Sequence, residues 1–132
     1  MSATDSSPSA TLYDHNNLRL GKIDADGTRY DHNNLRLGKI DAHGTVRNHN
    51  NLRIGQIDAD GTIRDRDNVR LGKIDSDGTV RDVKNVRLGK VEPDGRVLDK
   101  YNHPLGKTAG VLPGHSAVWF FFAAEMGIGQ EL

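Results

Sequence analysis

Two closely spaced carboxylates before a glycine are the first feature of this chain that could carry chemistry. The stretch Asp24-Ala25-Asp26-Gly27 has near copies at Asp58-Ala59-Asp60-Gly61 and Asp75-Ser76-Asp77-Gly78, and carboxylate oxygens are preferred ligands of Ca²⁺. An EF-hand loop, however, would need an acid where Lys22 stands and a bidentate Glu where Asn33 stands. The spacing therefore favours plain turn chemistry, with a weak divalent-cation site as the alternative.

Arginines recur with the same spacing as these turns. In the strand register derived below, Arg47 faces Arg53, and like charges that face each other are normally unfavourable. One interpretation is a solvated network with interleaved carboxylates such as Asp58 and Asp65, which the formal net charge of +0 favours. The other is a basic face whose guanidinium forks collect a phosphate, a polyanion or an acidic protein. The candidate residues for that face are Arg47, Arg53, Arg64, Arg70, Arg81 and Arg87.

Histidine and serine give weaker signals. His15, His32 and His49 share one period, so they could bind a transition metal if their loops converged, but a solvated turn is the favoured interpretation. Around Ser116 the sequence resembles a nucleophile elbow, yet Val118 stands where its second glycine belongs. We therefore interpret Ser116 as a helix cap or loop hydroxyl. Since no acid, base and nucleophile converge, we expect no enzyme, no cofactor and no metal site.

The elements that position these residues repeat every 17 residues, as the step from Gly21 to Gly38 shows (38 − 21 = 17). Each repeat has two turn signals. Asp-x-Asp-Gly supplies a side-chain acceptor and a glycine that tolerates positive φ, as a three-residue hairpin loop requires. The second signal ends in asparagine, which tolerates the left-handed conformation. These asparagines are Asn34, Asn51, Asn68, Asn85 and Asn102.

Counting outward from both turns predicts a register with one apolar face. The glycine turns pair Ile40 with Val46, Ile57 with Ile63, Ile74 with Val80 and Val91 with Val97. The asparagine turns pair Val46 with Ile54, Ile63 with Leu71 and Val80 with Leu88. Because the alternation slips by one residue between Leu37 and Ile40, we expect a bulge or bend at Gly38.

A meander of short strands with one apolar face must close or cover that face. Five units predict about ten strands, and a ring of that size encloses more space than short aliphatic side chains fill. The apolar run containing Trp119, Phe120, Phe121 and Phe122 is therefore expected to fill the axis as a plug. It is interpreted as a helix capped by Ser116 and ended at Gly127, with a buried strand as the alternative.

The predicted fold is thus an all-β, up-and-down meander of 17-residue hairpin repeats, closed into a ring or barrel around an apolar C-terminal segment. A β-solenoid with one coil per repeat is the alternative. We expect a flexible tail over residues 1–10, five hairpin units over 11–110, and the plug with a short tail over 111–132. Together they form one domain of 132 residues.

The composition limits the cellular compartment and the classes of partner that we expect. The chain has no cysteine, its charges balance at 18 against 18, and its start lacks the basic and apolar regions of a signal peptide. We therefore predict a cytoplasmic protein that binds no nucleic acid. The apolar run of eight residues (117–124) is far short of the roughly 20 that cross a membrane as a helix.

The phrase Ile-Asp-Ser-Asp-Gly-Thr-Val-Arg-Asp-x-x-Asn-Val-Arg-Leu-Gly-Lys at residues 74–90, repeated and followed by a Phe-rich end, resembles the bacterial five-fold beta-flower repeat proteins. The resemblance covers about residues 11–124 and implies β-hairpin petals around a hydrophobic terminus, with no activity to carry over. The last unit departs from the pattern at His103, Pro104 and Thr108. The function expected is a structural or interaction module that binds protein, either a second copy of the chain or another subunit of an assembly. A ligand-binding domain for cations or anions is the alternative.

Overall fold

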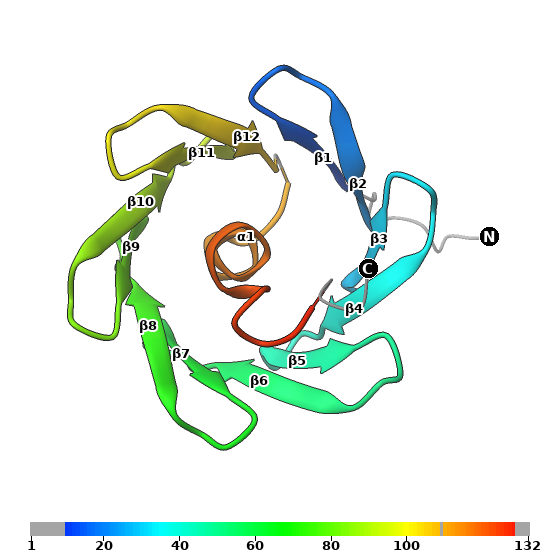
Figure 1. Cartoon of the computed structure of the whole chain (residues 1–132), viewed down its shortest axis with the longest axis horizontal. Coiled ribbons are helices and arrows are strands. Elements are labelled where there is room, and N and C mark those ends of the chain that lie inside the picture. Colours follow the sequence, from blue (N-terminus) through cyan, green and yellow to red (C-terminus); the bar gives the residue numbers. More distant parts are fainter. Residues whose placement is uncertain (1–9, 109, 129–132) are drawn as a thin grey trace.

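The computed structural model describes residues 10–108 and 110–128 of the chain. Consecutive antiparallel strands form a barrel, which β1 closes by pairing with β12 (Figure 1). This antiparallel order selects the ring over the β-solenoid. The twelve strands are β1 (Ala10–Asp14), β2 (Arg19–Ile23), β3 (Thr28–Asp31), β4 (Arg36–Ile40), β5 (Thr45–Asn48), β6 (Arg53–Ile57), β7 (Thr62–Asp65), β8 (Arg70–Ile74), β9 (Thr79–Asp82), β10 (Arg87–Val91), β11 (Arg96–Asp99) and β12 (Pro104–Lys107).

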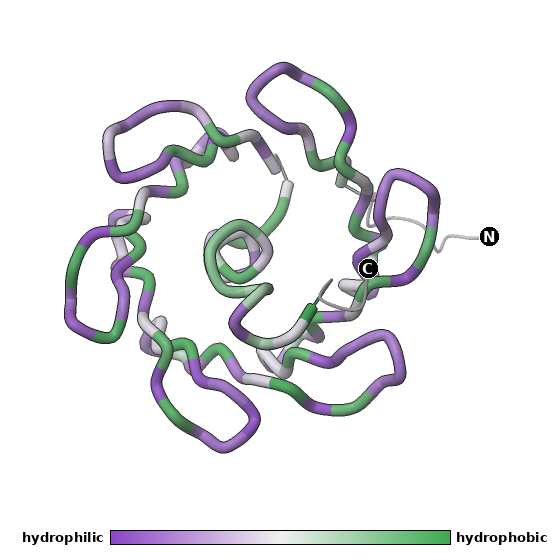
Figure 2. The backbone as a smooth tube through the Cα atoms, viewed as in Figure 1, coloured by the Kyte–Doolittle hydropathy of each residue, from purple (hydrophilic) through white to green (hydrophobic). Residues whose placement is uncertain are grey.

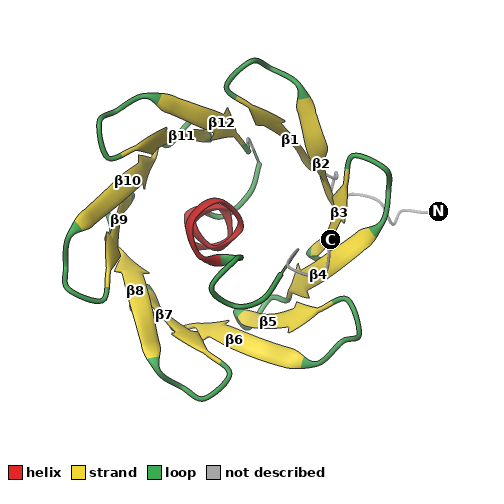
Figure 3. Cartoon of the chain, in the orientation of Figure 1, coloured by secondary structure: helices red, strands yellow, loops and turns green. Residues whose placement is uncertain are grey.

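Six hairpins splay outward from the ring as petals, each with an asparagine in its turn (Figure 3). The expectation of five units and about ten strands was therefore wrong by one petal. The missed petal is β1–β2, whose first strand has no Asp-x-Asp-Gly turn before it to mark the repeat. Of the expected N-terminal tail, residues 1–9 lie outside the described residues and Ala10 begins β1. Residues 129–132 of the expected C-terminal tail also lie outside them.

The two kinds of turn share one geometry, as the sequence predicted. In the petal turn, Asn68 donates its backbone N–H to the carbonyl of Asp65 at 3.0 Å, and in the glycine turn Gly61 donates to Asp58 at 3.0 Å. Both turning residues are left-handed, with φ of 69° at Asn68 and 93° at Gly61. The six petal asparagines, with φ between 67° and 70°, are Asn17, Asn34, Asn51, Asn68, Asn85 and Asn102.

The predicted register is confirmed at the glycine turns and for the arginine pairs beside the petal turns, but it is wrong by one residue at the aliphatic pair that follows each of those arginine pairs. Ile57 faces Ile63 and Ile74 faces Val80, as expected. Across the petal, however, Ile63 faces Gly72 instead of Leu71. The bulge expected beside the repeated glycine causes this shift, because the strand gains one residue there before the pairing resumes. The other two petal-turn pairs, Val46 with Ile54 and Val80 with Leu88, shift in the same way to Gly55 and Gly89.

A short helical segment occupies the axis of the barrel, which decides between the helix and strand alternatives (Figure 1). It consists of the α-helix α1 (Pro113–Ala117) and the π-helical η2 (Val118–Phe122). Figure 2 shows this mostly hydrophobic segment inside a ring whose outer loops are mainly hydrophilic. It packs on inward-facing aliphatic side chains such as Val46 and Ile63, each 0% exposed. The core therefore lies between the strands and the central helix.

The two predicted helix ends differ in outcome. Ser116 is not the N-cap, because α1 already begins at Pro113 and Leu112 stands at the cap without a side-chain hydrogen bond. Proline fits this first position because the N–H group that it lacks would have no partner within the helix there. Gly127 has a φ of 93° and donates to Ala124 at 3.1 Å, and Ile128 donates to Ala123 at 2.9 Å. This pair of bonds is a glycine-terminated closure, but it closes the turn after the helix, because η2 ends at Phe122 with Ala123 as its C-cap.

Candidate functional site

Four of the six repeated glycines each face a side chain of the C-terminal segment. A Cβ atom built on Gly72 would lie 2.7 Å from Cζ of Phe122, and one on Gly89 would lie 2.6 Å from Cζ of Phe121. The other two pairs are Phe120 with Gly106 and Met126 with Gly55. Three of these glycines therefore act as sockets for three of the four side chains predicted as the plug, of which Phe122 is 0% exposed.

Trp119, the fourth predicted plug residue, faces a different environment. The Cζ of Arg29 lies 5.9 Å from the centre of the Trp119 rings, within the range of a cation–π contact. Nη1 of Arg29 fills the space where a Cβ on Gly21 would stand, and it donates to the carbonyl of Tyr30. Sequence reasoning missed Arg29. The signal was its place in the repeat, where the next petal has Val46.

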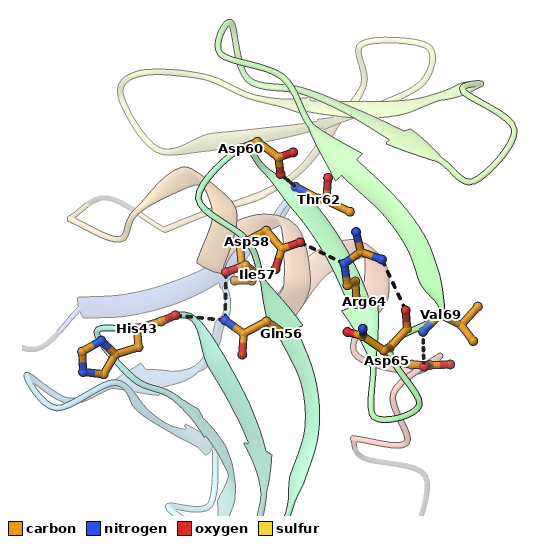
Figure 4. A network of polar contacts seen from close by, with 10 residues as sticks. His43, Gln56, Ile57, Asp58, Asp60, Thr62, Arg64, Asp65 and Val69 are labelled. Carbon is orange, nitrogen blue, oxygen red and sulfur yellow. Dashed lines mark hydrogen bonds and ion pairs between the residues drawn. The ribbon is translucent and has the colours of Figure 1, made fainter.

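The six arginines predicted as a basic face lie in opposite pairs on the petal strands: Arg47 with Arg53, Arg64 with Arg70, and Arg81 with Arg87. Carboxylates offset part of this like charge. Nε of Arg64 lies 2.9 Å from Oδ2 of Asp58 (Figure 4), and Nε of Arg81 lies 2.9 Å from Oδ2 of Asp75. The interleaved network is therefore present at these two positions.

Arginines at the start of the even-numbered strands also connect neighbouring petals. Nη1 of Arg53 donates to the carbonyl of Arg66 at 3.3 Å, and Nη1 of Arg87 donates to that of Lys100 at 3.0 Å. Nη2 of Arg87 donates to Oδ1 of Asn102 at 2.8 Å. Sequence reasoning missed these contacts, because the partners lie 13 and 15 residues away on the next petal. Binding of an anion by these rows stays a prediction.

The turn carboxylates bind their own backbone. Oδ1 of Asp65 accepts the N–H of Val69 at 3.0 Å, and Oδ1 of Asp60 accepts that of Thr62 at 2.9 Å (Figure 4). Such bonds favour the charged carboxylate and hold the pKa of Asp60 below its ordinary value of 3.8. Across residues 10–108 and 110–128, no three or more His, Cys, Asp or Glu side chains are grouped so that they could hold a metal ion.

The histidine and serine candidates are kept apart by the fold. His15, His32 and His49 are exposed on the turns of three successive petals. Ser116 is buried, and its Oγ lies 2.5 Å from Oγ1 of buried Thr108. This contact joins the central helix to the segment after β12. The structure thus gives Ser116 a role in packing.

Two adjoining recesses open at the end of the barrel that carries the glycine turns. Their volumes are about 520 Å³ and 410 Å³, and they share Ala42, Leu112 and His115. Burial lowers the pKa of His115, and nearby Asp41 opposes this shift. Neither recess is lined by a serine, threonine, cysteine or lysine among the described residues. The imidazole of His115 therefore has none of these four nucleophilic residue types beside it in the described lining of the recesses.

The outer turns carry apolar side chains that the register analysis did not consider. Each lies directly after the petal asparagine and directly before an arginine, and their exposed fractions run from 55% to 63%. A fully apolar side chain that stays this exposed at the same place in five of the six petals cannot contribute to the core. These five residues, which we call the petal rim, are Leu18, Leu35, Leu52, Val69 and Val86.

A family model described as a 5-fold beta-flower protein matches residues 9–123. The chain belongs to this family. Searches of curated proteins and of solved structures gave no match. The beta-flower fold and its repeats fit a structural or interaction module, and the family is not known as an enzyme family. Among the described residues of this beta-flower, no helix is long and apolar enough to cross a membrane.

Proposed function

We propose that this beta-flower is a non-enzymatic interaction module that binds protein through its petal rim, in the first place a second copy of the chain. The observation that carries the proposal is the repeated placement of an exposed aliphatic side chain on five successive petals. Single exposed apolar residues are common on protein surfaces, whereas a regular set of them marks an interaction surface more often. The ring would engage its partner at several equivalent points, so weak contacts would add up.

The chemistry beside the rim favours a partner that offers apolar groups and carboxylates together. Each rim residue precedes an arginine, for example Arg36 after Leu35 and Arg70 after Val69. The glycine turns at the opposite ends of the strands carry aspartates beside apolar residues, as in Asp58-Ala59-Asp60. One end of a ring therefore complements the other end of a second ring in charge. A head-to-tail contact of this kind is the expected mode of self-association.

A variant of the rim tests this proposal. Replacing all five rim residues by serine removes the apolar contacts, and because these side chains are exposed it should leave the melting temperature within a few degrees of wild type. Sedimentation equilibrium should then show that the apparent mass of the wild type rises with concentration and that of the variant does not. A matched control replaces exposed Val83 and Tyr101, which lie outside the rim, by serine.

Two results would contradict the proposal. A wild-type chain that keeps the mass of one copy at every concentration up to about 1 mM, above the range of weak specific contacts, would exclude self-association. A rim variant that associates as strongly as the wild type would show that the rim is not the interface.

A further inference from the structure

One position inside the barrel breaks the pattern of the other petals. Five petals place an aliphatic residue at the same height of the wall, and each is at most 1% exposed. These residues are Leu12, Val46, Ile63, Val80 and Val97. The remaining petal has Arg29 there, on β3, which puts a guanidinium beside the helix that fills the axis. An arginine at such a place requires partners for its charge and its donors.

Two nitrogen donors at this place have no hydrogen-bond partner in the described part of the chain. Nε of Arg29 and Nε1 of Trp119 are both buried and unpaired. The hydrogen bond that the structure gives to the guanidinium uses Nη1, which donates to the carbonyl of Tyr30. Nε of Arg29 therefore lacks an acceptor among the described residues. Buried donors of this kind are rare in native proteins and point to an acceptor.

The charge of Arg29 is also compensated only in part. None of the ion pairs among the described residues includes Arg29. Burial lowers the pKa of Arg29 to about 10, while Asp31 opposes and Arg19 adds to this shift. A water molecule could satisfy a donor, but it would leave the positive charge without a counterion. An anionic acceptor would do both.

We propose that Arg29 and Trp119 form a binding site for one carboxylate group inside the barrel. A carboxylate matches the Nε–Nη2 edge of an arginine because its two oxygens accept two parallel N–H donors. The indole N–H of Trp119 supplies a further donor, and the ring packs beside the guanidinium. This site is separate from the petal rim, so it stands or falls independently of self-association. Its occupant is a free carboxylate solute.

The tryptophan makes the site observable, because the chain contains a single Trp. We expect that sodium acetate at pH 7 changes the fluorescence of Trp119 in a saturable way. Because a ligand that binds only the native state stabilises it, the melting temperature should rise by about 3 °C or more. The variant Arg29→Val, which restores the residue type of the other petals, should fold and lose both responses. Arg36→Gln, at an exposed arginine on a petal, is the matched control and should keep them.

Two results would overturn the proposal. One is a wild type whose Trp119 fluorescence shows no saturable response to acetate. The other is an Arg29→Val variant that responds to acetate as the wild type does.

Discussion

Glycine in the Leu-Gly-Lys motif serves two purposes at one position. At Gly72 a side chain would meet both the carbonyl of Arg81 on the next strand and the ring of Phe122. The first contact explains why the bulge needs glycine, and the second explains how the helix fits so closely. The sequence predicted the bulge from the slip in alternation, but it contained no signal that tied a given glycine to a given aromatic residue.

Comparing two glycines separates these purposes. Gly72→Ala should lower the free energy of unfolding by about 1–3 kcal/mol more than Gly38→Ala, because overpacking against Phe122 adds to the backbone clash. Gly38 is the matched control, since the three atoms nearest to a Cβ there belong to Arg47 and Asn48 and none of them to the central helix. Urea unfolding of both variants measures the difference. Equal losses of stability would show that Phe122 does not occupy the Gly72 socket.

Acid should weaken the fold through the turn aspartates. Backbone N–H donors hold the pKa of Asp31 and Asp99 below the ordinary value of 3.8. A carboxyl group with a lowered folded pKa contributes stability that is complete above the unfolded value and is lost as the pH falls through the folded one. The melting temperature should therefore change little between pH 7 and 5 and fall below about pH 4.

Asparagine variants test the origin of this acid sensitivity. Asp31→Asn with Asp99→Asn keeps the acceptor oxygens but removes the titration, so the fall of the melting temperature below pH 4 should become shallower. The third petal already uses this substitution, because Asn48 accepts the N–H of Leu52 at 3.0 Å. An unchanged acid profile in the double variant would contradict the assignment.

At the scale of the elements, turn residues defined most of the register. Both turns were predictable because aspartate and a left-handed residue recur at fixed offsets. Pairs next to the glycine turns, such as Ile57 with Ile63, followed by counting. Beside the petal turns the arginine pairs also followed, but the next pair did not, since Leu71 takes up the extra residue of the bulge before Gly72. The sequence indicated a bulge near the repeated glycine, but it did not show whether the extra residue comes before or after the residue that faces Ile63.

The petal turn itself can be tested at Asn68, whose φ is 69°. Asn68→Ala should lower the free energy of unfolding by about 1 kcal/mol or more, because residues with a Cβ disfavour the left-handed conformation. Asn68→Gly should cost much less, since glycine adopts this conformation without strain. Thermal or urea unfolding measures both. A glycine variant as unstable as the alanine variant would show that contacts of the asparagine side chain matter more than its backbone.

At the scale of the whole molecule, the sequence predicted that the ring closes. It also predicted in outline that an apolar segment fills the axis of the ring. A repeated apolar face and an aromatic C-terminal run, from Trp119 to Phe122, predicted a ring around a plug. The number of petals was missed at β1–β2, where the repeat pattern is weakest. Arg29 was missed because a single exception within a repeat reads as variation until the structure places it beside Trp119.

The central claim is that the ring requires its own C-terminal helix, and truncation before Pro113 tests it most directly. The truncated chain would expose residues such as Val46 and Ile63, now 0% exposed, around an empty axis. We predict that it loses the cooperative thermal transition and aggregates, as followed by circular dichroism and light scattering on the full-length and truncated chains. A truncated chain that remains a soluble monomer with the melting temperature of the full-length protein would contradict the account.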